Sequence, residues 1–108
     1  MNRPREIPAA DPLDADIRER DEYLQMRVDG SLFIPISQLG ARLNEVPRDR
    51  PVLVICASGS RASNVTDYLL ASGWTDVASV AGGIETWARV GLPVTRGVIG
   101  PGEEQPRA

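Results

Sequence analysis

Cys56 is the residue of this chain whose chemistry follows most directly from its neighbours. It comes after the uninterrupted apolar run Val52–Ile55 and before a loop of small residues, 57–60, that leads to Arg61. A segment with helical spacing follows, so the thiol would lie at the end of a buried strand and face the start of a helix. The unpaired N–H groups and the dipole of a helix start stabilise an anion. Since the thiolate is the reactive form of cysteine, this arrangement favours a sulfur nucleophile.

The composition of the loop supports the same interpretation. Gly59 allows the backbone to curl so that successive N–H groups point inward as an anion-binding nest. Arg61 adds a fixed positive charge. The alternative is that Cys56 is a small buried hydrophobic residue, as most free cysteines are. Its place at a strand end, before a loop that contains glycine, favours the reactive interpretation.

The residue types that the chain lacks limit the chemistry further. It has no histidine, which excludes Cys–His and Ser–His catalysis and histidine-bearing zinc sites. All twelve basic residues are arginine, so Schiff-base chemistry and a P-loop lysine are excluded as well. A single cysteine forms neither an iron–sulfur cluster nor a C-x-x-C redox pair. We therefore expect no metal and no cofactor, and a thiol activated by backbone dipoles, arginine and small hydroxyl groups.

Length and charge predict one soluble domain. With 108 residues, 42% of them hydrophobic and 25% charged, the chain has one core. A net charge of −3 gives no electrostatic reason to expect nucleic acid or an anionic membrane as partner. No apolar run reaches transmembrane length, and the N-terminus lacks the apolar segment of a signal peptide. A lone cysteine suits a reducing compartment, and we expect a cytoplasmic monomer.

The order of apolar and turn-forming segments predicts an α/β domain with a mainly parallel sheet. Residues 1–14 are expected to be an extended or disordered arm, 15–96 the folded domain and 97–108 a flexible tail. Strands are predicted at 15–17, 32–34, 52–55 and 77–80. The uninterrupted run 52–55 indicates a strand buried on both faces. Because ligands of such sheets bind beyond the carboxyl ends of the strands, Cys56 is well placed for function.

Four helical segments are predicted between these strands. One or two turns span 20–26 with Asp21 as the N-cap, and a helix capped by Ser37 continues to Val46 before Pro47. The helix after the cysteine loop ends at Gly73, and the last helix follows Gly82-Gly83 and ends at Gly91 and Pro93. The apolar positions of the third helix recur at i, i+3, i+4 and i+7: Ala62, Val65, Thr66 and Leu69.

Four segments in this order make the chain resemble the single-domain rhodaneses, a family of sulfurtransferases. They span about residues 16–95 and match, in turn, the family patterns D-x-R-x-x-x-E-[FY], G-A-x-x-I-P, C-x-x-G-x-R and G-G-x-x-x-W…G-x-P-V. In this chain they read Asp16-x-Arg18-x-x-x-Glu22-Tyr23, Gly30-Ser31-Leu32-Phe33-Ile34-Pro35, Cys56-Ala57-Ser58-Gly59-Ser60-Arg61, and Gly82-Gly83-Ile84-x-x-Trp87 with Gly91-Leu92-Pro93-Val94.

The resemblance implies a rhodanese-like fold, with helices on both faces of the sheet, a shortened N-terminus and a defined reaction. Cys56 would attack the outer sulfur of a donor such as thiosulfate or a persulfide. The N–H groups of the loop would hold the resulting persulfide: Ala57, Ser58, Gly59, Ser60 and Arg61. With no second cysteine in the chain, the acceptor would be an external thiol, cyanide or a protein thiol.

The chain departs from the family pattern at two places. Ala57 stands where members that use thiosulfate often have a basic residue, which predicts poor turnover of that dianion. The helix that usually precedes Asp16 has no counterpart in residues 1–14, which leaves the first strand open. Both departures keep a second class in consideration, a non-catalytic sulfur carrier or regulatory module.

A cysteine phosphatase or arsenate reductase is the third class. Cysteine phosphatases separate cysteine and arginine by five residues, whereas four separate Cys56 from Arg61. The shorter loop makes a smaller cradle, which suits a sulfur atom better than a tetrahedral oxyanion. Arg61 would bind an anion or pair with Asp16 or Glu22, and Arg18 would be structural. Both carboxylates are expected to form hydrogen bonds that hold the fold.

Overall fold

A single parallel sheet organises the part of the chain that the structure, a computed structural model, describes, residues 12–97. Its strands lie in the order β2-β1-β3-β4, and each neighbouring pair is parallel. The four strands are β1 (Leu13–Asp16), β2 (Leu32–Phe33), β3 (Val52–Ile55) and β4 (Val77–Ser79). All four carboxyl ends therefore lie along one edge, which confirms the predicted fold class.

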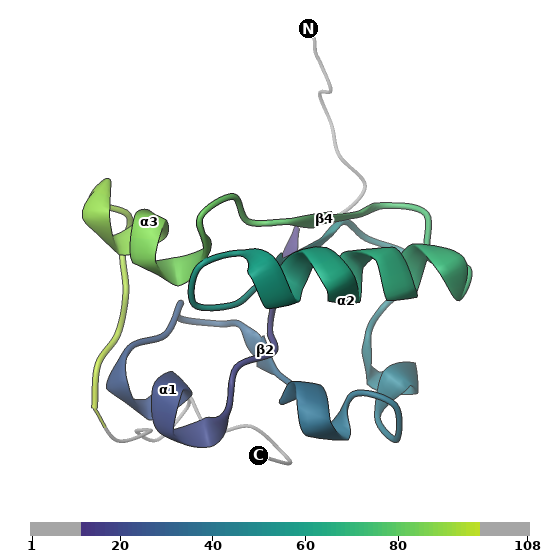
Figure 1. The fold of residues 1–108 in the computed structure, drawn as a ribbon, viewed down its shortest axis with the longest axis horizontal. Helices are drawn as coiled ribbons and strands as arrows, with labels where there is room; N and C mark the ends of the chain where they lie inside the picture. The colour runs from purple at the N-terminus through teal and green to yellow at the C-terminus, as the bar shows by residue number, and fades with distance from the viewer. Residues whose placement is uncertain (1–11, 98–108) are drawn as a thin grey trace, which may run out of the picture.

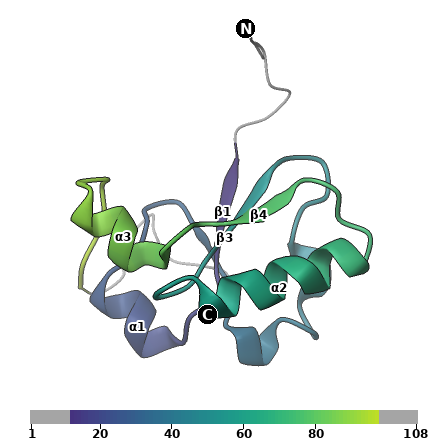
Figure 2. The ribbon, with the colours of Figure 1, turned by 45° about the horizontal axis from the view of Figure 1, so that its top comes forward.

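Helices cover both faces of the sheet, as predicted. Figures 1 and 2 show the longest one, α2, on one side of the strands and the two shorter helices, α1 and α3, on the other. Two 3₁₀ turns, η1 and η2, lie on the same side as α2. The bounds are α1 Arg20–Gln25, η1 Ile36–Gln38, η2 Leu43–Glu45, α2 Ser60–Ala71 and α3 Gly83–Arg89.

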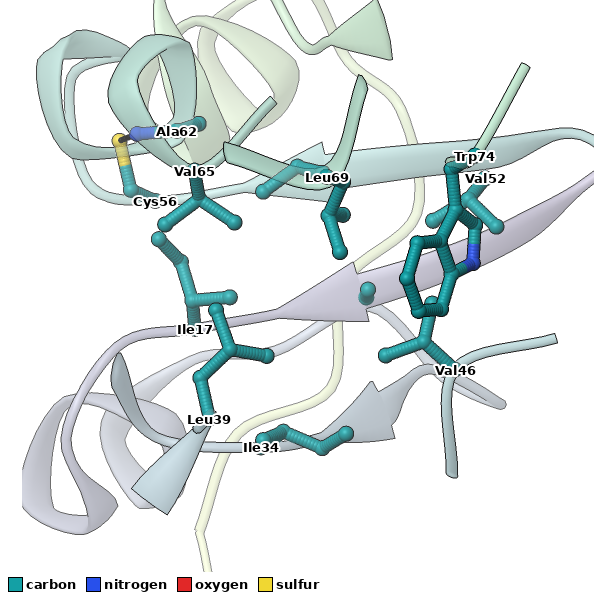
Figure 3. Packing of buried hydrophobic residues seen from close by; sticks show 12 residues of the cluster. Ile17, Ile34, Leu39, Val46, Val52, Cys56, Ala62, Val65, Leu69 and Trp74 are labelled. Atoms are coloured by element: carbon teal, nitrogen blue, oxygen red, sulfur yellow. Dashed lines mark hydrogen bonds between the residues drawn. The ribbon is translucent and has the colours of Figure 1, made fainter. Parts of the chain in front are cut away.

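The central strand β3 serves two apolar clusters, one on each face. Val52 and Val54 pack toward α2 in the larger cluster, which also contains Cys56 (Figure 3). Ile55 points to the opposite face and packs with Val28 and with Ile84 of α3. Since side chains alternate along a strand, a run that is apolar at every position anchors both layers.

The predicted apolar stripe of α2 is confirmed at each position. Its buried residues are Ala62, Val65, Thr66 and Leu69. Full burial of a valine or leucine side chain stabilises a fold by about 1.5–3 kcal/mol. This stripe fixes the rotation of α2 on the sheet, and thereby the direction in which its first turn faces.

Two local predictions are wrong. The N-cap of α1 is Glu19 rather than Asp21, because Glu19 and Glu22 form a reciprocal capping box. Between Pro35 and Pro47 there is no continuous helix but only the turns η1 and η2. Gly40 lies between these turns and weakens a helix there, and the buried Arg42 holds the irregular segment by donating to the carbonyl oxygen of Phe33.

The first strand is present and begins early. Strand β1 starts at Leu13, two residues before the predicted domain boundary, and pairs with both β2 and β3. Most of the predicted arm and tail, 1–11 and 98–108, lies outside the described residues. Within 12–97, no helix is both long and apolar enough to cross a membrane.

Candidate active site

Cys56 lies directly after β3 at the carboxyl edge of the sheet, where the sequence placed it. Its side chain is buried, with 1% of the residue exposed. The Sγ atom accepts hydrogen bonds from two backbone N–H groups, that of Gly59 at 3.0 Å and that of Ala62 at 3.3 Å. Figure 3 shows the bond from Ala62. Gly59 makes the required turn with a φ of 107°, in the left-handed region. The sulfur therefore sits in the first turn of α2, in a setting that stabilises negative charge.

The loop contains further backbone N–H donors besides those of Gly59 and Ala62. The N–H groups of Ala57, Ser58, Ser60 and Arg61 donate to no atom within residues 12–97. Ser58 and Ser60 are exposed. The loop therefore contains N–H groups that are available to a ligand within the part of the chain that the structure describes.

The first turn of α3 donates hydrogen bonds to two carbonyl oxygens at the start of the cysteine loop. The N–H of Ile84 donates to the carbonyl oxygen of Cys56 at 2.8 Å, and that of Glu85 to the carbonyl oxygen of Ala57 at 3.1 Å. In a trans peptide the next N–H points opposite to the carbonyl. These two hydrogen bonds therefore turn the N–H groups of Ala57 and Ser58 away from α3 and leave them free.

Close approach between α3 and the loop requires glycine at position 83. Gly83 has a φ of +64°, and a Cβ there would lie far inside van der Waals contact with the carbonyl oxygens of Cys56 and Ala57. Gly59 also contacts this region, since a Cβ on it would lie 3.2 Å from the backbone nitrogen of Gly82. The two glycines thus allow the backbone-to-backbone packing that shapes the loop.

Arg61 is oriented by α1. Its guanidinium donates to both carboxylate oxygens of Glu22, at 3.2 and 3.0 Å. This hydrogen bonding is the main reason that the pKa of Glu22 lies below its usual value and that of Arg61 above its usual value. Of the two expected partners, Asp16 and Glu22, the structure selects Glu22.

Arg18 and Asp16 form a separate buried pair. Arg18 donates to Asp16 through Nε and Nη2, and its other contacts are the carbonyl oxygens of Glu22 and Met26. Their side chains are 4% and 0% exposed. This hydrogen-bonded pair ties β1 to α1 at Glu22 and at the C-cap Met26, which agrees with the structural role expected for these residues.

A hollow of about 170 Å³ opens beside the loop. It is bordered by the loop at Ala57, by α1 and by the first turn of α3. The residues around it are Arg18, Glu22, Gln25, Met26, Ala57, Ile84 and Glu85. This hollow is large enough for the part of a small donor that is not transferred.

The site uses backbone groups far more than side chains. Within residues 12–97 there is no cluster of three or more His, Cys, Asp or Glu side chains that could hold a metal. Of the residues predicted at the site, Gly59 contacts Sγ through its N–H, and Ala57, Ser58, Ser60 and Arg61 have N–H groups that donate to no atom within residues 12–97. Sequence reasoning missed the N–H of Ala62, although the third residue of a helix always carries an unpaired donor.

The fold and this loop define a class: an α/β domain that delivers one cysteine from a central parallel strand to a cradle of backbone N–H groups. The rhodanese-like domain family matches this chain over residues 7–90. A sulfurtransferase from Allochromatium vinosum is 38% identical over 84 residues, which are 78% of each chain. The thiosulfate sulfurtransferase GlpE of Actinobacillus pleuropneumoniae serotype 3 is 35% identical over 80 residues, 74% of each chain.

Solved structures agree with the sequence relatives. The crystal structure of a rhodanese-related protein from Thermoplasma volcanium superposes with a TM-score of 0.74 at 33% identity, over 78% of this chain and 83% of that one. The chain therefore belongs to the rhodanese family, as the sequence resemblance predicted. The curated relatives named above carry sulfurtransferase names.

Proposed function

We propose that this protein is a sulfurtransferase that carries a sulfane sulfur on Cys56. The observation that carries this proposal is the combination of two N–H groups on Sγ with four unpaired N–H groups in the same loop. A thiolate needs the first set, and a persulfide, whose charge lies on an added outer sulfur, needs more donors further out. The names of the relatives support the same chemistry.

The reaction has two half-steps. In the first, the Cys56 thiolate attacks the outer sulfur of the donor and a new S–S bond forms. With thiosulfate the old S–S bond breaks, sulfite leaves with its electron pair, and the charge of −3 is conserved. In the second, an external nucleophile takes the outer sulfur, and the Cys56 thiolate is released with the bonding electrons.

The acceptor comes from outside the chain. Cys56 is the only cysteine, so no internal thiol can resolve the persulfide. A small thiol, cyanide or a thiol of a second protein would serve. A reducing compartment such as the cytoplasm suits this step because it keeps acceptor thiols reduced.

Intact-mass measurement of the full chain tests the proposal directly. Incubation with thiosulfate or with a small-molecule persulfide should add about 32 Da, the mass of one sulfur. The adduct should be absent in Cys56→Ser and should disappear after addition of cyanide, with thiocyanate formed. Absence of an adduct with every donor, or an equal adduct in Cys56→Ser, would overturn the proposal. Substantial hydrolysis of an aryl phosphate would point instead to phosphatase chemistry.

A further inference from the structure

The donor's carried group, the part that leaves after sulfur transfer, has a defined place in this site. Cys56 is part of the larger apolar cluster, where core residues that include Ala62 and Val65 occupy its inner side. On the outer side, Ala57 borders the hollow between α1 and α3. Since Ala57 directly follows Cys56 in the chain, this hollow is a space beside the loop that can receive the carried group of a donor.

The charges around the hollow do not balance. Arg18 is neutralised by Asp16, and Arg61 by Glu22, with N–O distances of 2.8 and 3.0 Å. The lowered pKa of Glu22 keeps this carboxyl ionised at neutral pH, so the Arg61 charge stays compensated. Glu85 remains, and within residues 12–97 it has no ion-pair partner.

The nearest candidate to compensate Glu85 is engaged elsewhere. Arg89 lies one helical turn further along α3, but its guanidinium donates to the hydroxyl of Thr86 at 3.4 Å. The chain has no lysine or histidine that could take this role. Among residues 12–97, the Glu85 carboxylate is therefore an uncompensated negative charge beside the hollow, and the backbone N–H of Glu85 donates to the carbonyl oxygen of Ala57.

We propose that Glu85 is a specificity-determining residue, whose carboxylate favours sulfur donors with a neutral or cationic carried group over donors with an anionic one. This inference rests on the proposed sulfurtransferase function. Thiosulfate is disfavoured because the group it carries, sulfite, is a dianion that must approach this carboxylate. A persulfide of an aminothiol is favoured, because its ammonium group is attracted to the same charge.

Two persulfides with the same two-carbon spacer and opposite terminal charges test the effect. Cysteamine persulfide carries an ammonium group and 3-mercaptopropionate persulfide a carboxylate. In both, the Cys56 thiolate attacks the outer sulfur of R–S–SH, the donor S–S bond breaks, and the thiolate RS⁻ leaves with its electron pair. The outer sulfur keeps its proton, so the products are Cys56–S–SH and RS⁻.

The experiment measures the rate of sulfur loading by quenched-flow intact mass at low ionic strength. The ratio of the cysteamine rate to the mercaptopropionate rate should fall about fivefold in Glu85→Gln and further in Glu85→Lys. Thiosulfate loading should rise in the same order. Salt at 0.5 M should reduce the differences between variants, because it screens charges beyond a few ångströms.

Asp76→Asn is the matched control. It removes one negative charge, as Glu85→Gln does, but at the start of β4. The N–H of Val52 donates to the carbonyl oxygen of Asp76 there, at the end of the sheet away from Cys56. Its rate ratio should equal that of the unmodified chain, and thermal unfolding should show that every variant is folded.

The outcomes separate the two proposals. An unchanged ratio in folded Glu85→Lys, or an equal change in Asp76→Asn, would overturn the role of Glu85 and leave the sulfurtransferase intact. Failure of all three donors to load Cys56 in the unmodified chain would overturn the proposed function itself, and this inference with it.

Discussion

The polar groups at the two ends of the sheet differ in whether they have hydrogen-bond or stacking partners. At the amino end, the Trp74 indole N–H donates to the carbonyl oxygen of Pro47 at 3.0 Å, and the Arg48 guanidinium stacks 3.6 Å from the centre of that ring. At the carboxyl end, the loop after Cys56 leaves four N–H groups without a partner within residues 12–97. At the amino end the polar groups of Trp74 and Arg48 have partners, and at the carboxyl end the loop keeps its donors available.

This difference suggests that the amino end of the sheet contributes mainly to stability and the carboxyl end mainly to the chemistry of Cys56. Trp74 belongs to the larger apolar cluster and is 4% exposed, so its contribution lies in burial. The cysteine loop contributes little apolar area beyond Cys56 itself, and its unpaired donors cost stability unless water or a ligand satisfies them. Changes at the amino end should therefore affect unfolding, and changes at the carboxyl end should affect sulfur loading.

Trp74→Ala is expected to have the largest effect on stability. Loss of a buried tryptophan should lower the free energy of unfolding by about 3–5 kcal/mol. Urea denaturation measures this loss. The fraction that remains folded should load sulfur on Cys56 at an unchanged rate. The milder Trp74→Phe should show the same separation with a smaller loss, and slower loading in folded Trp74→Phe would break the distinction between the two ends.

Gly83→Ala tests whether the carboxyl end depends on backbone shape. The added Cβ would push α3 away from the carbonyls of Cys56 and Ala57, so the loop would lose the contacts that orient its N–H groups. We expect sulfur loading to slow about tenfold, which corresponds to about 1.4 kcal/mol.

Gly91→Ala is the matched control for this change. Gly91 also has a left-handed φ, +90°, but nothing lies within 4 Å of the position of an added Cβ. It should therefore lose stability through backbone strain while loading sulfur at the original rate. Equal slowing in both variants would mean that the loss of loading follows from general destabilisation rather than from the contact between α3 and the loop.

Glu22→Gln should have the smallest effect, on the pH dependence of stability. The hydrogen bond from Arg61 is the main cause of the lowered pKa of Glu22. Glu22 therefore contributes stability that is complete above the usual pKa of a glutamate and is lost as the pH falls through its lowered pKa. Since about a third of each side chain is exposed, this contribution is less than about 1 kcal/mol.

Asp14→Asn should change the pH dependence of stability in the opposite direction to Glu22→Gln. Burial raises the pKa of Asp14, so its ionisation costs stability as the pH rises from the usual pKa of an aspartate to the raised value, and the full cost remains above it. Asp14→Asn should therefore stabilise the fold at neutral pH, whereas Glu22→Gln should flatten the loss of stability in acid. Thermal unfolding between pH 3 and 7 measures both, and an unchanged acid slope in Glu22→Gln would refute the role of the Arg61 pair.

Regular patterns made most of the fold predictable from sequence. The sequence predicted β3 from the continuous apolar run 52–55 and α2 from the apolar stripe between Ala62 and Leu69. The position of Cys56 between these two elements followed directly. The segment from Ile36 to Val46 has similar apolar spacing but contains Gly40, and the contacts of Arg42 hold it in an irregular form. Spacing alone does not reveal such contacts.

The site was predictable in its residues but not in its geometry. Cys56 and the loop to Arg61 stand out by type and spacing, whereas the selection of Glu22 as the partner of Arg61 depends on where the fold places α1 relative to the first turn of α2. The free N–H groups of Ala57 and Ser58 depend on hydrogen bonds from α3 to the preceding carbonyls. These contacts join segments that are far apart in the sequence, so they can be read only from the folded structure.

The contact between α3 and the cysteine loop also has a consequence for the order of events during synthesis. The ribosome adds Cys56 nearly thirty residues before Ile84, which is about one to six seconds at usual rates of translation. During that interval the thiol exists without the helix that orients its loop. The hydrogen bonds that orient the loop around Cys56 are therefore complete only when the last helix docks.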